Sequence, residues 1–400
     1  MSDRPLAPHP IARSPEDWAA VLTTLGERPF RAKEVFRWIH QRNALDPEAM
    51  TSLPRGLRQS LFQVNGEPAR SAGTLTTSHR SADDTRKLLI GLHDGATIES
   101  VLIPRVSGPG KMTGNPLDAA ASSSADDDDD DAEPVEGSPG KTEPAIRVTQ
   151  CVSTQVGCAM GCGFCASGVA GLKRHLGPEE IVAQVLIARA TLDPGEALRN
   201  VVYMGMGEPL HNYEATKRSL ELLTHPDGIG LSKRRVTVST SGLVPEIARL
   251  GADFGGQIAL AISLHAADDE TRSTLMPINR KYPLAELIAA LRAYPLAPRR
   301  RITIEYTLVA GRNDSDQAAR ALSRLLRPLR VKINLIPMNP ITGSSETGPG
   351  ADRVFAFQSI LTNEGYSCFI RRQRGDDVAA ACGQLALAGE RRKVRSLLGR

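Results

Sequence analysis

Strand-length hydrophobic runs alternate with segments of helical periodicity over most of the second half of the chain. Six runs end in polar, glycine or cysteine residues: "QCVSTQVGC", "NVVYMGMGEP", "RRVTVSTSG", "QIALAISLHA", "RITIEYTLVAG" and "VKINLIPMNP". The segments between them, such as "GPEEIVAQVLIARATL" and "SDQAARALSRLLRPL", carry apolar residues at helical spacing and acidic residues near their starts. Strands that alternate with helices form parallel sheets through right-handed crossovers. The pattern predicts an α/β fold, a partial (β/α)6 TIM-like barrel, with a doubly wound open sheet as the alternative.

The chain before this repeat has two other patterns. Helical periodicity in "SPEDWAAVLTTLG" and "RPFRAKEVFRWIHQRN", with Ser14 as an N-cap, predicts a small N-terminal helical domain over residues 1–70. The stretch "RKLLIGLHDGATIESVLIP" alternates on both sides of Asp94 and Gly95, a sequence typical of tight turns. We therefore expect a β-hairpin extension within residues 71–105.

Residues 106–145 differ from the rest in composition. They are rich in Gly, Pro, Ser and Asp and hold ten acidic residues against two basic ones, which predicts a disordered acidic insertion. Because the formal net charge of the chain is +4, the remainder carries +12, a balance that suits a polyanionic partner, although solvated surface charge is the ordinary alternative. We expect the barrel to occupy residues 146–375 and a C-terminal segment to occupy 376–400.

The start of the chain lacks an apolar segment of signal-peptide type, and no run approaches the roughly 18 apolar residues of a membrane span. We expect a cytoplasmic protein with no membrane partner. Cysteines in such a protein are metal ligands or reactive thiols more often than members of a structural disulfide framework.

Three cysteines, Cys158, Cys162 and Cys165, lie close together in "GCAMGCGFC". A structural zinc site needs four ligands, but the chain has no second Cys-x-x-Cys pair, and His175 lies outside the usual ligand spacing. Iron–sulfur clusters also take cysteine thiolates, normally four per four-iron cluster. Three thiolates leave one iron open, which favours a cluster that performs chemistry over a closed zinc site.

The Cys-x-x-x-Cys-x-x-Cys spacing is the radical S-adenosylmethionine (SAM) signature. Together with "GMGEPLHN", "LSKRRVTVSTSGLVP", "ISLHAADDETR", "LMPINRKYP", "NLIPMNP" and "RRQRGDDVAAACGQLA", it resembles the radical SAM adenine C2 methyltransferase family (RlmN/Cfr branch). The resemblance covers nearly the whole chain except the acidic insertion. It implies a partial barrel of the radical SAM type and methylation at C2 of adenine 2503 in 23S rRNA and of adenine 37 in tRNAs.

The resemblance also implies a set of cofactor sites. Cys158, Cys162 and Cys165 would hold one [4Fe-4S] cluster whose fourth site binds SAM. Glycines in "GMGEP" would let the backbone approach a ligand closely, and a carboxylate in the same motif suits the ammonium group of SAM. The cofactor contacts implied in this way are Gly207, Glu208, Ser239, Ser263, Leu264, His265 and Asn339.

The resemblance assigns catalytic roles to three further residues. Cys382 would carry a methyl group from one SAM molecule, and a second SAM molecule would activate it for attack on adenine. Glu99 would remove the C2 proton as general base, and Cys151 would release the product through a transient disulfide with Cys382. From the residues alone, Cys382 is more typical of a buried helical cysteine, and Glu99 fits an ordinary exposed strand acid.

The partners implied are 23S rRNA, tRNA and an electron donor such as flavodoxin or ferredoxin, and we expect a monomer. Two alternatives stay open. One is methylation at C8 of the same rRNA adenine, an activity that uses the same cysteines. The other is a non-catalytic iron–sulfur or zinc protein that binds RNA.

Overall fold

The computed structural model describes residues 8–64, 67–105, 146–341, 345–371, 374–381 and 383–385. Within these residues one 10-stranded sheet has the order β14-β13-β12-β11-β10-β9-β6-β5-β4-β3. The acidic insertion, Cys382 and residues 386–400 lie outside the described part. The strands are β3 (Thr74–Arg80), β4 (Arg86–Gly91), β5 (Thr97–Pro104), β6 (Ile146–Cys151), β9 (Glu196–Tyr203), β10 (Val236–Thr240), β11 (Ala259–Ser263), β12 (Ile302–Leu308), β13 (Val331–Pro337) and β14 (Cys368–Ile370).

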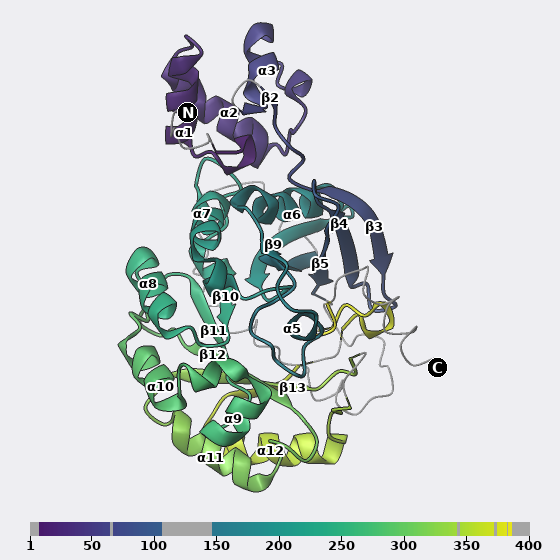
Figure 1. Cartoon of the computed structure of the whole chain (residues 1–400), viewed down its shortest axis with the longest axis vertical. Coiled ribbons are helices and arrows are strands. Elements are labelled where there is room, and N and C mark those ends of the chain that lie inside the picture. Colours follow the sequence, from purple (N-terminus) through teal and green to yellow (C-terminus); the bar gives the residue numbers. More distant parts are fainter. Residues whose placement is uncertain are drawn as a thin grey trace.

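The strands β6 and β9 through β14 run parallel to one another. Helices follow these strands and cover the outer face of the curved sheet (Figure 1). They are α6 (Pro178–Ala190), α7 (Tyr213–Thr224), α8 (Val244–Phe254), α9 (Asp269–Leu275), α10 (Leu284–Ala293), α11 (Asp316–Leu326) and α12 (Ala351–Asn363). The prediction of an α/β partial barrel is confirmed, and each of the six expected strands is present. The short parallel strand β14 was not expected from the sequence.

The β-hairpin expected within residues 71–105 extends the sheet of the barrel. β4 and β5 form the expected antiparallel pair, and Gly95 at their turn has a φ of +82°, which favours glycine. β3 joins this pair, although its polar and largely exposed sequence gave no strand signal. β5 pairs with β6, so the insertion lies between adjacent strands, and the Arg105 amide donates to the Arg147 carbonyl at 2.7 Å.

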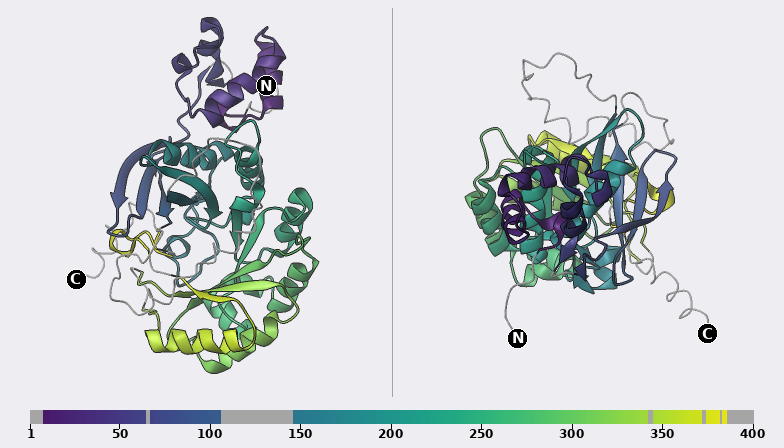
Figure 2. Two further views of the ribbon diagram at one scale, coloured as in Figure 1. Left: turned by 180° about the vertical axis from the view of Figure 1, so that it is seen from behind. Right: turned by 90° about the horizontal axis from the view of Figure 1, so that it is seen from above.

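The N-terminal helices sit at one end of the barrel, next to α6 and α7 (Figure 2). They are α1 (Pro15–Thr24), α2 (Ala32–Phe36), a π-helical turn η3 (Arg37–Gln41) and α3 (Arg55–Leu61). Ser14 caps α1 as expected, in a reciprocal capping box with Asp17. Arg189 on α6 donates to the carbonyls of His40 (2.6 Å) and Gln41 (2.9 Å), which ties the helical region to the barrel.

Alternate residues along the parallel strands are buried beneath the helices. Val238, Ile262 and Ile304 are fully buried and belong to the main apolar core. On each strand, the residues directly before and after these buried ones therefore face the concave side of the sheet. No helix among the described residues is both long and apolar enough to cross a membrane.

Candidate active site

Strand register places Glu99 and Cys151 on the same face of the sheet. Val101 on β5 lies directly opposite Cys151 on β6, and Glu99 is two residues from Val101 on the same strand. Cys151 in turn lies beside Val202 on β9, which lies beside Thr237 on β10. Because paired residues and residues two apart on a strand project to the same face, all five side chains face the concave side.

The same face carries polar residues further along the sheet. Ser239 is two residues beyond Thr237, and Ser263 lies beside Glu305, which lies beside Asn334. Residues from strands far apart in the sequence thus share the inner surface of the barrel. This is the arrangement that the polar strand ends predicted.

Glu99 is buried, with 3% of its surface exposed, so the structure excludes the interpretation of Glu99 as an exposed strand acid. Its carboxylate forms an ion pair with Lys87 of β4 at 3.4 Å, and both side chains are only 4% exposed. Its backbone carbonyl accepts a 2.6 Å hydrogen bond from the buried hydroxyl of Ser153. Lys87 was not identified from the sequence, because a lysine in an alternating strand gives no signal of burial.

The cysteine loop follows β6 and the two-residue strand β7 (Gln155–Val156). Cys158 and Cys162 are buried and Cys165 is partly buried. Burial raises the pKa of Cys158 to about 12, with smaller contributions from Glu208 and Cys165. The pKa of Cys162 is also raised, by burial and then by the other two thiols. The three thiols therefore lie close enough to interact.

Three clustered thiols fit the thiolate ligand set of an iron–sulfur cluster. The described residues contain no group of three or more His, Cys, Asp or Glu side chains arranged around a single ion. His175 on β8 (Arg174–His175) engages the Gln155 side-chain nitrogen at 3.0 Å and packs against His211, with ring centroids 5.0 Å apart. Its position gives no support to a zinc site completed by His175.

Close packing fixes the path of the cysteine loop. At Gly157, with φ +78°, a Cβ atom would lie 1.8 Å from the Gly171 carbonyl oxygen, and at Gly168 a Cβ would lie 2.9 Å from backbone atoms of Cys162. Neither site tolerates a side chain. The ring of Phe164 packs edge-on against His265 at the end of β11, with centroids 4.6 Å apart. The loop is thus held against a strand end that carries predicted cofactor contacts.

Glu208 lies at the start of η6 (Pro209–Asn212) and is buried, with 4% exposed. Its two carboxylate oxygens accept backbone hydrogen bonds from Leu210 at 3.1 Å and from Ser241 at 2.8 Å. Burial raises its pKa, while these hydrogen bonds oppose the rise. A carboxylate held in this way keeps acceptor capacity for a cation such as an ammonium group.

The glycines of the same motif are required by the protein itself. A Cβ at Gly205 would lie 2.7 Å from the Ser153 hydroxyl and the Val152 carbonyl, and one at Gly207 would lie 2.6 Å from Gln155. Gly207 also has a φ of +103°. These glycines thus allow close packing against the segment after β6, whereas the approach of a ligand to them stays a prediction.

The end of β11 is fixed through its backbone and through His265. The Leu264 amide donates to the Glu305 carbonyl at 3.0 Å, and His265 adopts a positive φ of 55°. The Nδ1 atom of His265 accepts a hydrogen bond from the Thr307 amide at 2.8 Å, and burial lowers its pKa to about 3. His265 is therefore neutral with its proton on Nε2. Asn339 beyond β13 is also buried, with 5% exposed.

A buried arginine that sequence reasoning missed connects two of these strand ends. Arg272 on α9 is fully buried and donates to the carbonyls of Leu264 at 3.0 Å and Ser241 at 2.7 Å. It also donates to the Asn279 side chain at 2.8 Å, and burial lowers its pKa to about 10. In "DDETR" this residue looks like an ordinary surface arginine of a helix. Only the tertiary fold places it beneath the site.

Cys382 itself is outside the described residues, but both of its neighbours are described. The Gly383 carbonyl accepts a 2.8 Å hydrogen bond from the Ala166 amide, directly after Cys165, and the Leu385 carbonyl accepts one of 2.6 Å from Ser167. Residues 374–381, before Cys382, contact the β3–β4 region, and Figure 1 shows this segment between α5 (Ala166–Ala170) and the lower ends of β3 to β5.

Comparisons with known proteins agree with this geometry. Residues 152–322 match the model of the Radical SAM superfamily, and residues 14–65 match that of the Ribosomal RNA large subunit methyltransferase N-terminal domain. The chain is 68% identical to the dual-specificity RNA methyltransferase RlmN of Sorangium cellulosum over 100% of both chains. The chain belongs to the RlmN family. It is also 42% identical to a probable dual-specificity RNA methyltransferase RlmN of Moorella thermoacetica, over 94% of this chain and 96% of the relative.

A solved structure supports the same assignment for the fold. The crystal structure of a radical SAM methyltransferase from Sphaerobacter thermophilus aligns with a TM-score of 0.79 and 40% identity, over 94% of this chain and 98% of that one. The resemblance to the RlmN family inferred from the sequence is confirmed. The Radical SAM match includes the cysteine loop but not Glu99, Cys151 or Cys382, and the individual roles of all the expected site residues stay predictions.

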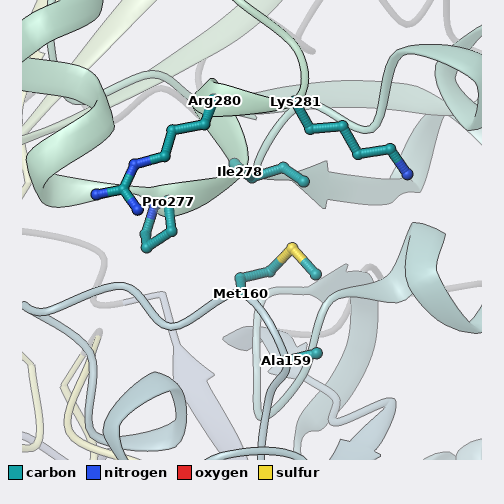
Figure 3. Close-up of a pocket in the computed structure, with 6 residues that line it drawn as sticks. All are labelled: Ala159, Met160, Pro277, Ile278, Arg280 and Lys281. Atoms are coloured by element: carbon teal, nitrogen blue, oxygen red, sulfur yellow. The ribbon is translucent and has the colours of Figure 1, made fainter.

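One side of the cysteine loop in this RlmN-family chain borders a pocket of about 410 Å³. It is lined by Ala159, Met160, Pro277, Ile278, Arg280 and Lys281. Figure 3 shows Met160, from the gap between Cys158 and Cys162, opposite Ile278, with the side chains of Arg280 and Lys281 extending to opposite ends. The cysteine loop therefore has an open apolar neighbour with cationic edges.

Proposed function

We propose that this chain methylates C2 of adenine in RNA, with adenine 2503 of 23S rRNA and adenine 37 of tRNAs as the substrates. Its membership of the RlmN family supports the reaction class. The observation that carries the proposal is that Glu99 and Cys151 lie on the same inner face of the sheet. The residue after Cys382, Gly383, is hydrogen-bonded to Ala166, directly after the cysteine loop.

Two cofactors are needed, and the residues present fit both. Cys158, Cys162 and Cys165 would hold a [4Fe-4S] cluster, and the buried Glu208 carboxylate would bind the ammonium group of SAM. Ser239 and Asn339 would contribute further polar contacts from strand ends. When bound, the cluster and SAM supply the one-electron chemistry that activates the methyl group on Cys382.

The chain's own residues would then complete the reaction. The sulfur of Cys382 brings the carbon that bonds to C2, so the enzyme is joined covalently to RNA. Glu99 removes the C2 proton: the C–H bond breaks, and its electron pair stays with the ring. The one unpaired electron that radical addition leaves on the adduct would pass to a one-electron acceptor, a role that the iron–sulfur cluster would supply. The thiolate of Cys151 attacks the Cys382 sulfur, an S–S bond forms, and the S–C bond breaks. The released carbon keeps the electron pair of the broken S–C bond and takes a proton to become the methyl group.

RNA binding requires a surface that accepts a folded polyanion and reaches an unstacked base. The N-terminal helical region, matched to the methyltransferase N-terminal domain, is the proposed RNA-binding part. An external electron donor such as flavodoxin or ferredoxin would supply electrons, and we propose that the enzyme acts as a monomer in the cytoplasm.

The test is anaerobic reaction of the reconstituted protein with 23S rRNA fragments and tRNA, followed by nucleoside analysis that separates 2-methyladenosine from 8-methyladenosine. We expect only the C2 product with the wild-type chain. We expect a covalent enzyme–RNA adduct and no product with Glu99→Gln. Formation of the C8 isomer, or no cleavage of SAM under reducing conditions, would contradict the proposal.

A further inference from the structure

Lys87 occupies an unusual position for a lysine. Its ammonium group is 3.4 Å from the Glu99 carboxylate, with both side chains 4% exposed, and it also donates to the Ala379 carbonyl at 3.3 Å. Burial of a charged lysine is costly unless the charge is paired and hydrogen-bonded, and these two contacts provide both. The lysine thus joins the inner face of β4 and β5 to the segment that leads to Cys382.

Other contacts hold the same segment against the β3–β4 region. The Gly375 amide donates to Asp83 at 3.2 Å, and the Asp377 carboxylate accepts from the Ser81 hydroxyl at 2.5 Å and the Ala82 amide at 3.1 Å. The hydrogen bond from Ser81 and, to a smaller extent, that from Ala82 lower the pKa of Asp377. All of these contacts are with residues of the turn before β4. Lys87 contacts both this segment and Glu99 itself.

We propose that Lys87 is a positioning residue, whose ammonium group holds the Glu99 carboxylate and the Ala379 carbonyl together and keeps the base beside the segment that leads to Cys382. The inference deepens the proposed function and rests on Glu99 being the base. It adds a residue to the site, because neither the family models nor the sequence patterns gave Lys87 a role.

The charges explain why the pair suits a proton transfer. Before the step, Glu99 is an anion that Lys87 neutralises, which keeps the base ionised in a buried site. When Glu99 takes the C2 proton, an O–H bond forms and the carboxyl becomes neutral. The ammonium group then loses the charge of Glu99 but keeps the Ala379 carbonyl as an acceptor. Removal of the lysine charge should therefore make Glu99 harder to ionise.

Other titratable groups around this face come from the neighbouring elements. Cys151 projects from β6 on the same face as Glu99, and Arg374 and Asp377 lie on the segment before Cys382. Arg374 donates to the Pro104 carbonyl at 3.2 Å, and Asp377 is bound to the β3–β4 turn. Arg374 is thus bound to the backbone at the end of β5 and Asp377 to the turn before β4, while Lys87 forms an ion pair with Glu99.

The experiment uses the full-length holoenzyme and three variants of Lys87. Lys87→Gln removes the charge but keeps a hydrogen-bond donor, Lys87→Met removes both, and Lys87→Arg keeps both. Single-turnover product formation is measured between about pH 6 and pH 9. Hydrogen exchange of residues 374–381 is measured in the same proteins without RNA.

We expect the acid limb of the pH profile to move upward by about one pH unit or more in Lys87→Gln and Lys87→Met, with rates recovering at high pH. The limb should stay near its wild-type position in Lys87→Arg. Exchange of 374–381 should rise at least severalfold in Lys87→Met and less in Lys87→Gln. If Lys87→Gln or Lys87→Met does not fold, the test is the comparison of Lys87→Arg with the wild-type protein. A shifted acid limb of its pH profile, or fast hydrogen exchange of residues 374–381, then overturns the inference.

Glu99→Gln separates the two proposals. If Glu99→Gln forms product at the normal rate, the proposed function fails at its base. If Glu99→Gln accumulates the adduct while all three Lys87 variants keep the wild-type acid limb and the wild-type exchange, the role of Lys87 is wrong and that of Glu99 stands.

Discussion

The hydroxyl of Ser153 donates a 2.6 Å hydrogen bond to the backbone carbonyl of Glu99. The same oxygen accepts a 2.9 Å hydrogen bond from the Met206 amide, and Ser153 is fully buried. One side chain after β6 thus fixes both the strand that carries the proposed base and the glycine motif that precedes Glu208. The position of Glu99 is therefore determined by contacts between segments far apart in the sequence.

Replacement of Ser153 by alanine should destabilise the protein by about 1–3 kcal/mol, because it leaves the buried Met206 amide without its acceptor. Product release should also slow, since the base loses a support. The measurements are urea denaturation and single-turnover kinetics. Ser71→Ala is the control, because Ser71 is exposed and its change should stay within about 0.5 kcal/mol. Equal stability of the two variants would contradict the role given to Ser153.

Replacement of Cys158, Cys162 or Cys165 by alanine should reduce bound iron from about four atoms per chain to a small fraction, because each thiolate holds one corner of the cluster. Intact-mass analysis of the wild-type protein should show one extra methyl group, located on Cys382 by peptide mapping and absent from these variants. The matched control is Cys368→Ala, since Cys368 is an equally buried cysteine on the outer strand β14. Loss of iron from the control, or an unmodified Cys382 in active wild-type protein, would count against the site.

The sequence predicted the barrel well because its parallel strands are buried on one face and bounded by polar strand ends. It missed β3, whose residues are mostly exposed and polar, and β14, which has three residues. Both segments form strands because they pair with a neighbouring strand, and their local composition does not indicate that pairing.

The site divides in a similar way. The cysteine spacing is a local signal, and it predicts three metal ligands without any knowledge of the fold. Glu99 could be assigned only through the family resemblance, since its burial depends on Lys87 and on the segment 374–381. Arg272 and Lys87 gave no signal, because a buried cation differs from a surface one only in what tertiary structure places around it.

The affinity for SAM should depend on the ionisation of Glu208. Burial raises the pKa of this carboxyl above its ordinary value, so it becomes neutral at a higher pH than an exposed glutamate as the pH falls. The neutral form pairs poorly with an ammonium group, so SAM binding should weaken through that transition. The unliganded fold gains stability over the same interval, because a raised carboxyl pKa favours the protonated form in the folded state.

Glu208→Gln is the matched variant for this measurement. It should bind SAM about ten- to a hundredfold more weakly near neutral pH and show no such pH dependence, because it loses a charge-assisted hydrogen bond. Equilibrium binding of SAM over a range of pH gives both results. A wild-type affinity that stays constant through the acidic range would refute the assignment.

Asp94 should contribute stability that acid removes. A hydrogen bond from Arg174, at 2.6 Å, lowers the pKa of Asp94 from 3.8 to about 2. A lowered carboxyl pKa stabilises the fold above the unfolded value and loses that effect as the pH falls from about 3.8 toward about 2. Since the Asp94 side chain is 36% exposed, solvent screening limits the effect to about 1 kcal/mol or less.

Urea denaturation at about pH 5 and about pH 3 measures this contribution. Asp94→Asn should lose less stability than wild type between the two values. Asp84→Asn is the control. Asp84 pairs with Arg80, but the two side chains are 60% and 51% exposed, respectively, so loss of this ion pair should leave the acid dependence of stability unchanged. Identical acid dependence of Asp94→Asn and wild type would show that Arg174 does not stabilise the Asp94 charge.

The acidic insertion should be replaceable by a short turn. Its two ends are adjacent, because Pro104 pairs with Val148 and the Arg105 amide donates to the Arg147 carbonyl at 2.7 Å. A four-residue Gly/Asn turn in place of 106–145 should therefore keep β5 and β6 in register, with Glu99 and Cys151 on one face. Shortening this loop roughly tenfold should lower the entropic cost of closing the loop by about 2 kcal/mol, which favours the folded state.

The effect of this replacement is measured by thermal unfolding and by RNA methylation with each substrate. A variant that folds with a raised melting temperature but no longer methylates RNA would show that the insertion takes part in function.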